Sequence, residues 1–229
     1  MRQLLQHTSE LPEYTDAIAT SIFEVRDEYH SPRDFLDAAL ARPAAFQPGE
    51  KFAYTNTNYI VLGLLIEKVT KRTLGEQIDQ RIVQPLSLLH TYLPAPGDRT
   101  IHGKHPEGYE RNPVSGELEN ITEQDPSWAW AAGAMISTPS ELNIFMQKML
   151  DGTLITADSV AEMQKSIHTE THSDYGLGLI GYSLSCGTAV TIAVTAIPTA
   201  VAKDPTGEES IRAAFEPIKE ALDNLLCGS

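Results

Sequence analysis

The sequence has few of the groups that nucleic-acid-binding and membrane-spanning proteins need. Its 229 residues include 17 Lys and Arg against 31 Asp and Glu, giving a net charge of −14. Nucleic-acid phosphates and anionic membranes would repel such a chain. The longest apolar run, "YIVLGLLI", is well short of the ~20 residues that a membrane-spanning helix requires. We therefore expect no nucleic-acid partner and no membrane span.

Cysteine is also scarce, with only Cys186 and Cys227, each followed by glycine. One disulfide would close a loop of about forty residues, stabilise the fold by roughly 3–4 kcal/mol and imply an oxidising compartment. Two buried free thiols are the alternative, and composition does not decide between them. No apolar signal-peptide core follows Met1, so no signal peptide is expected in this chain.

An apolar content of 41% with 21% charged residues is typical of a folded globular protein. Ser31 followed by Pro32 predicts a helix start, and so does Thr138 followed by Pro139. Further helices are predicted over about 58–70, which should be central and buried, and over 73–86, ended by a proline. Residues 92–127 show no clear period and predict a long, partly extended excursion.

The last third of the sequence changes character. "DYGLGLIGYSL" and the β-branched "GTAVTIAVTAI" predict strands. Residues 208–226 predict an amphipathic helix, kinked at Pro217. The order is helices first, then a small sheet, then a helix.

Histidine pairs are weak candidates for a metal site. His168 and His172 would share a helix face, but the glutamate that a metalloprotease needs after the first histidine is Thr169 here. His102 and His105 have no cysteine or carboxylate cluster beside them in the sequence. We expect exposed histidines, no metal and no organic cofactor.

The best candidate for chemistry is "YTNTNY", directly before the apolar helix. Tyr54 and Asn56 are two apart in an extended segment, so their side chains should face one cleft. A phenol near a cation can have a lowered pKa and act as a general base, and a carboxamide can pair with a peptide-like amide. The alternative is structural: Asn56 or Asn58 caps the helix and Tyr54 packs.

Several stretches together resemble the serine β-lactamase and penicillin-binding-protein family, especially its class C-like, secreted D-alanyl-D-alanine carboxypeptidases. They are "LLQHTSELP", "FQPGEKFAYTNTNYIVLGLLIEKVT", "IVQPLSLLHTYLP", "WAWAAGAMISTPSELNIFMQKMLDG", "YGLGL" and the paired "CGT" and "CGS". The resemblance implies that Tyr54 moves the proton of nucleophile and leaving group, and that Asn56 binds the substrate amide. It also implies that Trp128 forms an aromatic wall of the substrate cleft and that Cys186 and Cys227 form a structural disulfide.

The sequence departs from that family in three places. No serine has lysine three positions later, so the family's Ser-x-x-Lys nucleophile is missing. No Lys- or His-Thr/Ser/Gly-Gly triplet follows "CGT", and Glu10 stands where the family's "HTSG" has a flexible glycine. Acyl transfer needs nucleophile, base and oxyanion site together, so the chain as given is predicted to be inactive.

The resemblance implies an α+β, β-lactamase/transpeptidase-like fold, incomplete at the N-terminus and in the sheet. We expect a single such domain over 1–229, mostly helical in 1–172, with strands and the last helix in 173–229. The chain would be a fragment, a mis-started gene product or a degenerate paralogue.

The implied function is D-alanyl-D-alanine carboxypeptidase chemistry on peptidoglycan stem peptides. Alternatives are a β-lactamase or esterase of the same family, or a non-catalytic remnant that binds peptidoglycan or a β-lactam. We expect a monomer whose complete form is extracellular or in the cell envelope.

Overall fold

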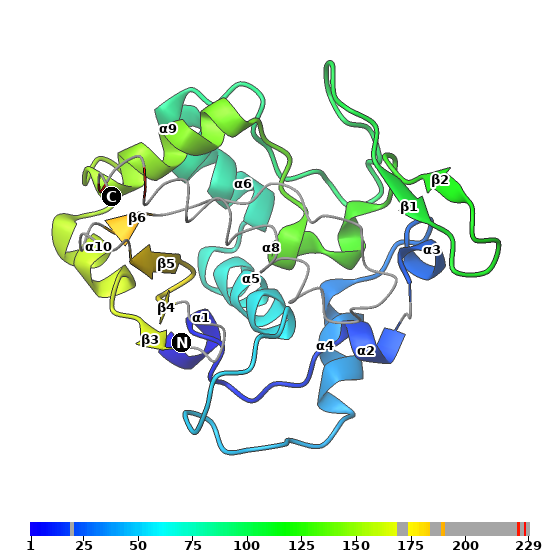
Figure 1. Cartoon of the computed structure of the whole chain (residues 1–229), viewed down its shortest axis with the longest axis horizontal. Coiled ribbons are helices and arrows are strands. Elements are labelled where there is room, and N and C mark those ends of the chain that lie inside the picture. Colours follow the sequence, from blue (N-terminus) through cyan, green and yellow to red (C-terminus); the bar gives the residue numbers. More distant parts are fainter. Residues whose placement is uncertain (19–20, 169–173, 184–188, 191–223, 225–226, 228–229) are drawn as a thin grey trace. The chain divides into compact units, whose positions relative to one another are not determined.

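The computed structural model describes residues 1–18, 21–168, 174–183, 189–190, 224 and 227. The chain forms two compact units, Met1–Val160 and Ala161–Ser229, so the single domain over 1–229 stays a prediction. The helices are α1 Arg2–Leu5, α2 Thr15–Ile18, α3 Ile22–Val25, α4 Pro32–Leu40, α5 Thr57–Thr70, α6 Leu74–Ile78, α7 Gln84–Leu86, α8 Trp130–Gly133, α9 Pro139–Leu150 and α10 Ala157–Met163 (Figure 1).

Two helices begin where their capping residues predict. At α4 the Ser31 hydroxyl accepts from Asp34 N–H at 3.2 Å, and the Asp34 carboxylate accepts from Ser31 N–H at 3.0 Å. At α9 the Thr138 hydroxyl accepts from Glu141 N–H at 3.3 Å. These bonds satisfy N–H groups that the first turn of a helix leaves without partners, so both predicted starts are confirmed.

Helix α5 is the central element of the first unit. It contacts α1, α4, α6 and α8, and Figure 1 shows it among them. Gly63 permits the contact with α8, because a Cβ there would lie 2.7 Å from Ala131 Cβ and 2.8 Å from the Trp130 ring. The buried core around this contact consists of Tyr14, Phe35, Ala39, Ile60, Leu74 and Trp130.

The predicted helix over 73–86 is interrupted. Helix α6 begins at a Thr73–Glu76 capping box, but a π-helical turn, Asp79–Val83, separates it from α7. Pro85 lies inside α7, whose last residue is Leu86. The predicted range of 73–86 agrees with the last residue of α7, although Pro85 itself lies inside that helix.

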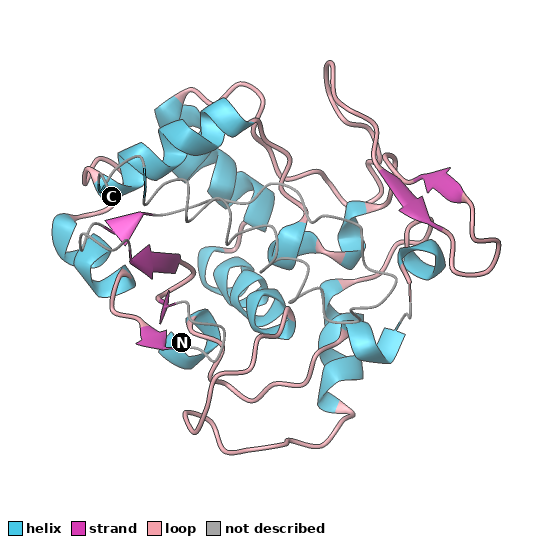
Figure 2. Ribbon diagram, in the orientation of Figure 1, coloured by secondary structure: helices cyan, strands magenta, loops and turns pink. Residues whose placement is uncertain are grey.

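The excursion over 92–127 contains a hairpin that the sequence did not predict. Strands β1 Tyr109–Arg111 and β2 Leu118–Asn120 pair antiparallel (Figure 2). Their exposed–half-buried–exposed pattern leaves no buried face. Without such a face a strand shows no hydrophobic alternation, and this explains why it was missed.

The described part of the second unit is an antiparallel sheet in the order β3-β4-β5-β6. Its strands are β3 Ile167–His168, β4 Asp174–Tyr175, β5 Ile180–Ser183 and β6 Ala189–Val190. The single strand predicted over "DYGLGLIGYSL" is two strands, with a turn at Gly178, where φ is +75°. The rest of the predicted second strand and most of the predicted last helix lie outside the described residues.

The α+β expectation is confirmed by helices that precede a small antiparallel sheet. Within the described residues, no helix has both the length and the apolar content that crossing a bilayer demands.

Candidate functional site

Tyr54 lies on the segment that enters α5, and Asn56 is the N-cap residue of that helix, with a helical backbone (φ −63°, ψ −27°). Tyr54 is 55% exposed and Asn56 is half-buried, while Thr55 between them is only 3% exposed. The common face expected for the phenol and the carboxamide assumes an extended chain at both residues, so it stays a prediction.

The amides at the start of α5 are not satisfied by the side chain of either asparagine. Asn56 N–H donates to Glu13 Oε2 at 2.6 Å, and Thr57 N–H donates to the Thr55 hydroxyl at 3.2 Å. Asn56 occupies the N-cap position, but its side chain makes no capping hydrogen bond. The structural alternative, in which an asparagine side chain caps this helix, is therefore wrong for Asn56. Its carboxamide is not used as a cap.

Asn58 has the opposite environment. Its side chain is fully buried, its Oδ1 accepts from the Ser9 hydroxyl at 2.5 Å, and its Nδ2 lies 3.1 Å from His7 Nδ1. Both ends of this carboxamide are thus bonded within the protein. Of the two asparagines in "YTNTNY", Asn56 is the one placed to meet a ligand.

His7 lies beneath the ring of Tyr54. The imidazole is fully buried and stacks on the Tyr54 ring, with centroids 4.2 Å apart and an interplanar angle of 27°. Burial lowers the pKa of His7 to about 4. At neutral pH the imidazole beneath Tyr54 is therefore uncharged.

The pKa of Tyr54 is raised, and this corrects one sequence-based idea. Loss of hydration on the covered part of the phenol raises it most, followed by Tyr59 and by the negative charge of Glu13. The sequence suggests a phenol whose pKa is lowered by a cation, but besides the loss of hydration the groups that act on the pKa of Tyr54 are the Tyr59 phenol and the Glu13 carboxylate. Tyr54 is therefore a protonated hydrogen-bond donor at neutral pH.

We expect the Tyr54 phenol to titrate above 10, its ordinary pKa. The measurement is the difference between the absorbance titrations of the chain and of Tyr54→Phe at the phenolate band, with circular dichroism to confirm that both stay folded. Tyr29→Phe is the control, since Tyr29 is exposed to a similar degree, 58%. A midpoint below 10 for Tyr54 would reveal a cation that the described residues do not supply.

Trp128 lies in a different group of side chains. Its indole Nε1 donates to Gln124 Oε1 at 2.8 Å, and its carbonyl accepts from the Tyr14 hydroxyl at 2.6 Å. The indole lines a cavity of about 140 Å³ whose walls include Ile101 and Met135 but neither Tyr54 nor Asn56. The role of Trp128 in the substrate cleft therefore stays a prediction.

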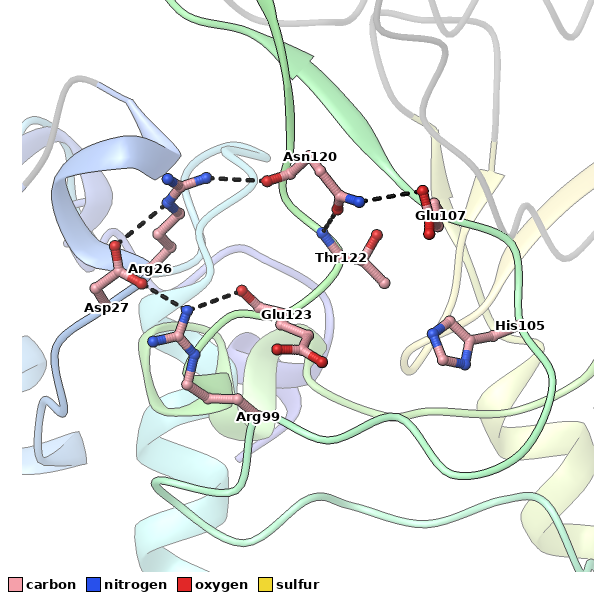
Figure 3. A pocket seen from close by; sticks show the side chains of 8 residues that line it. All are labelled: Arg26, Asp27, Arg99, His105, Glu107, Asn120, Thr122 and Glu123. Carbon is pink, nitrogen blue, oxygen red and sulfur yellow. Dashed lines mark hydrogen bonds and ion pairs between the residues drawn. The ribbon is translucent and has the colours of Figure 1, made fainter.

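A larger polar pocket of about 340 Å³ lies between α3 and the hairpin (Figure 3). Its positive groups are tied to the protein: Arg26 Nε and Arg99 Nη2 bind the two oxygens of Asp27 at 3.4 and 2.6 Å. Each guanidinium also donates to a backbone carbonyl, that of Asn120 or Glu123. The two arginines thus hold the base of the hairpin against α3.

The remaining predictions receive no further support from the geometry. Cys186 lies outside the described residues, so its disulfide with Cys227 stays a prediction. His172 is likewise outside them, and His168 Nδ1 lies 3.2 Å from Asp174 Oδ1. Across the described residues, no group of three or more His, Cys, Asp or Glu is arranged to hold a metal ion.

Sequence reasoning missed His7, Ser9 and Asn58. The structure joins His7 and Ser9 through the side chain of Asn58. Nothing local could reveal this link, because the contacts span 49 and 51 residues of sequence.

The Beta-lactamase family matches this chain over residues 1–187. A putative D-alanyl-D-alanine carboxypeptidase of Salmonella enteritidis PT4 is 26% identical over 163 residues, which are 62% of this chain and 38% of that protein. Protein flp of Staphylococcus aureus is 31% identical over 102 residues, 44% of this chain and 20% of its own length. The chain therefore spans well under half of either relative.

Solved structures show the same fold. A D-stereospecific amidohydrolase from Streptomyces is 34% identical with a TM-score of 0.76, over 82% of this chain and 58% of that one. A penicillin-binding protein of Bacillus halodurans superposes with a TM-score of 0.70 over 94% of this chain and 71% of that one, at 21% identity.

Proposed function

The chain belongs to the beta-lactamase family, and from this premise we propose that it recognises an amide on the carboxyl side of a D-amino acid. Two relatives support this substrate class by name: one is a putative D-alanyl-D-alanine carboxypeptidase and the other a D-stereospecific amidohydrolase. A peptidoglycan stem peptide carries such an amide, and a β-lactam is its cyclic counterpart. In this proposal either compound binds at Tyr54 and Asn56.

The observation that carries the proposal is the contrast between Asn56 and Asn58. Asn58 is enclosed and bonded on both sides, whereas the Asn56 carboxamide is half-buried and makes no capping bond. A carboxamide offers a donor and an acceptor, so it can pair with the C=O and N–H of a bound peptide at once. Tyr54, protonated at neutral pH, would donate to the substrate carbonyl or the leaving nitrogen.

Recognition is proposed without acyl transfer. In these 229 residues no serine is followed three positions later by lysine, and Tyr54 and Asn56 do not supply a nucleophile. Without a nucleophile no acyl-enzyme forms, however well the amide is bound. Carboxypeptidase, β-lactamase or esterase turnover would therefore require groups that this sequence does not contain.

The decisive experiment is intact-protein mass spectrometry of the chain after incubation with a labelled penicillin. We expect no mass increase, together with reversible binding of penicillin or of an acyl-D-alanyl-D-alanine peptide in an NMR titration. A stable adduct on a serine would overturn the claim that the nucleophile is missing. Absence of binding by both compounds would overturn the proposed function itself.

Replacing Asn56 by alanine is expected to weaken peptide binding by about tenfold, the typical effect of one lost hydrogen bond. The measurement is the dissociation constant from the same NMR titration. Asn143→Ala is the matched control, because Asn143 is an exposed asparagine on α9. Equal loss of affinity in Asn56→Ala and Asn143→Ala would contradict the role of Asn56. So would a parent chain that binds the acyl-L-alanyl-L-alanine peptide as tightly as the D,D-peptide.

Further parts of the proposal concern the protein as a whole. We propose a monomer in the cell envelope or outside the cell, with Cys186 and Cys227 joined in a disulfide. Light scattering measures the first property, and the mass change on reduction and alkylation measures the disulfide.

A further inference from the structure

The buried residues beneath "YTNTNY" form one connected network. His7 lies at its centre, surrounded by the rings of Tyr54 at 4.2 Å, Tyr59 at 5.5 Å and Phe52 at 6.0 Å between centroids. Its backbone is in the left-handed region, with φ of +53°. A non-glycine residue in this region costs conformational energy, so tertiary contacts must hold His7 in place.

The imidazole is bonded to the middle of the Tyr54–Asn56 segment. His7 Nδ1 accepts from the backbone N–H of Thr55 at 3.2 Å. Because Thr55 stands between the two candidate residues, this bond fixes the peptide unit that sets their mutual orientation. The backbone of His7 makes a second hydrogen bond to this segment, because its carbonyl accepts from Ala53 N–H at 2.8 Å.

Asn58 holds the imidazole from the other side. With Nδ1 accepting from Thr55, the nearby Asn58 Nδ2, at 3.1 Å, is a donor to the same nitrogen. Asn58 Oδ1 then accepts from Ser9, whose hydroxyl oxygen also accepts from Leu11 N–H at 3.1 Å. The network therefore joins the first turn of α5 to the segment that follows α1.

We propose that His7 and Asn58 are positioning residues, which hold the Tyr54 phenol and the Asn56 carboxamide in the arrangement that binds an amide. Neither residue touches the ligand. His7 acts on Tyr54 through the ring stack and on Asn56 through the Thr55 amide, and Asn58 keeps the imidazole oriented. This inference rests on the proposed function for its ligand, but the arrangement itself is observable without one.

The first test needs no ligand and compares two replacements of His7. A ring stacked at 4.2 Å shifts the NMR signals of the Tyr54 ring, and His7→Phe should keep this shift whereas His7→Gln should lose it. Conversely, His7→Gln offers an acceptor to Thr55 N–H, which should stay protected from hydrogen exchange, and His7→Phe should lose that protection. Tyr54 signals that are unchanged in both folded variants would overturn the positioning role.

The second test is a double-mutant cycle on peptide binding. We expect His7→Phe and Asn58→Ala each to weaken binding of the acyl-D-alanyl-D-alanine peptide by about tenfold in chains that remain folded. In the Asn56→Ala background His7→Phe should have little further effect, since it keeps the ring stack on Tyr54 and acts on Asn56 through the Thr55 amide, and the Asn56 carboxamide is gone. Full additivity would overturn the inference. If the parent chain does not bind the peptide, the proposed function fails, and the first test still decides whether His7 positions Tyr54.

Discussion

Replacing Phe35 by alanine is expected to lower the free energy of unfolding by about 3–5 kcal/mol, the usual cost of removing a large aromatic side chain from a core. Phe35 is fully buried on α4 and stacks on Tyr14, with ring centroids 4.7 Å apart. Tyr14 is held by two further hydrogen bonds. Its N–H donates to the Thr57 hydroxyl at the start of α5, and its own hydroxyl donates to the Trp128 carbonyl. A cavity at Phe35 therefore loosens the residues next to the candidate site.

Urea unfolding followed by tryptophan fluorescence measures this effect. Both tryptophans, Trp128 and Trp130, lie in the first unit, so the signal reports on the unit that contains Phe35. Leu89→Ala is the control, because Leu89 is 85% exposed and its loss should change stability by less than about 0.5 kcal/mol. A small effect at Phe35, equal to that at Leu89, would contradict the described core.

Lowering the pH from about 6.5 to 4 is expected to remove roughly 3 kcal/mol of unfolding free energy through His7 alone. In the folded chain the pKa of His7 is lowered to about 4, below the unfolded value of 6.5, because burial disfavours the charged ring. Between these values the unfolded chain binds a proton that the folded chain does not. The contribution is therefore complete above pH 6.5 and is lost as the pH falls toward 4.

The check is the slope of unfolding free energy against pH in the parent chain and in His7→Gln. The variant should be less stable at pH 7 but should lose less stability between pH 6.5 and 4.5. Carboxylates with a lowered pKa, such as Asp34 and Asp151, titrate below their ordinary value of 3.8 and leave this interval nearly unaffected. Equal slopes in the two chains would show that His7 is hydrated or charged in the folded state.

Features that depend on near neighbours in the sequence were predicted well. The starts of α4 and α9 were found because a capping side chain and the amide that it binds are only three residues apart. Helix α5 was found because its apolar residues are continuous, and Tyr54 and Asn56 were singled out by their spacing and by the motif that they resemble. The family itself followed from the same short stretches of sequence.

Features without a local pattern were missed. The β1–β2 hairpin has no buried face, and the π-helical turn before α7 has no composition of its own. The hairpin is held by its own backbone hydrogen bonds and by distant contacts, such as the bond from Arg26 to the Asn120 carbonyl. Propensity and periodicity do not record contacts of this kind.

The sequence by itself determined the family, the order of helices before sheet, the acidic charge and the absence of a Ser-x-x-Lys nucleophile. Only the tertiary structure decided which asparagine of "YTNTNY" faces outward and which is enclosed, and it gave Tyr54 a raised pKa where a lowered one had been considered. The physical reason is distance along the chain. The ring, carboxylate and hydroxyl that settle these points belong to His7, Glu13 and Ser9, which folding brings against α5 from more than forty residues away.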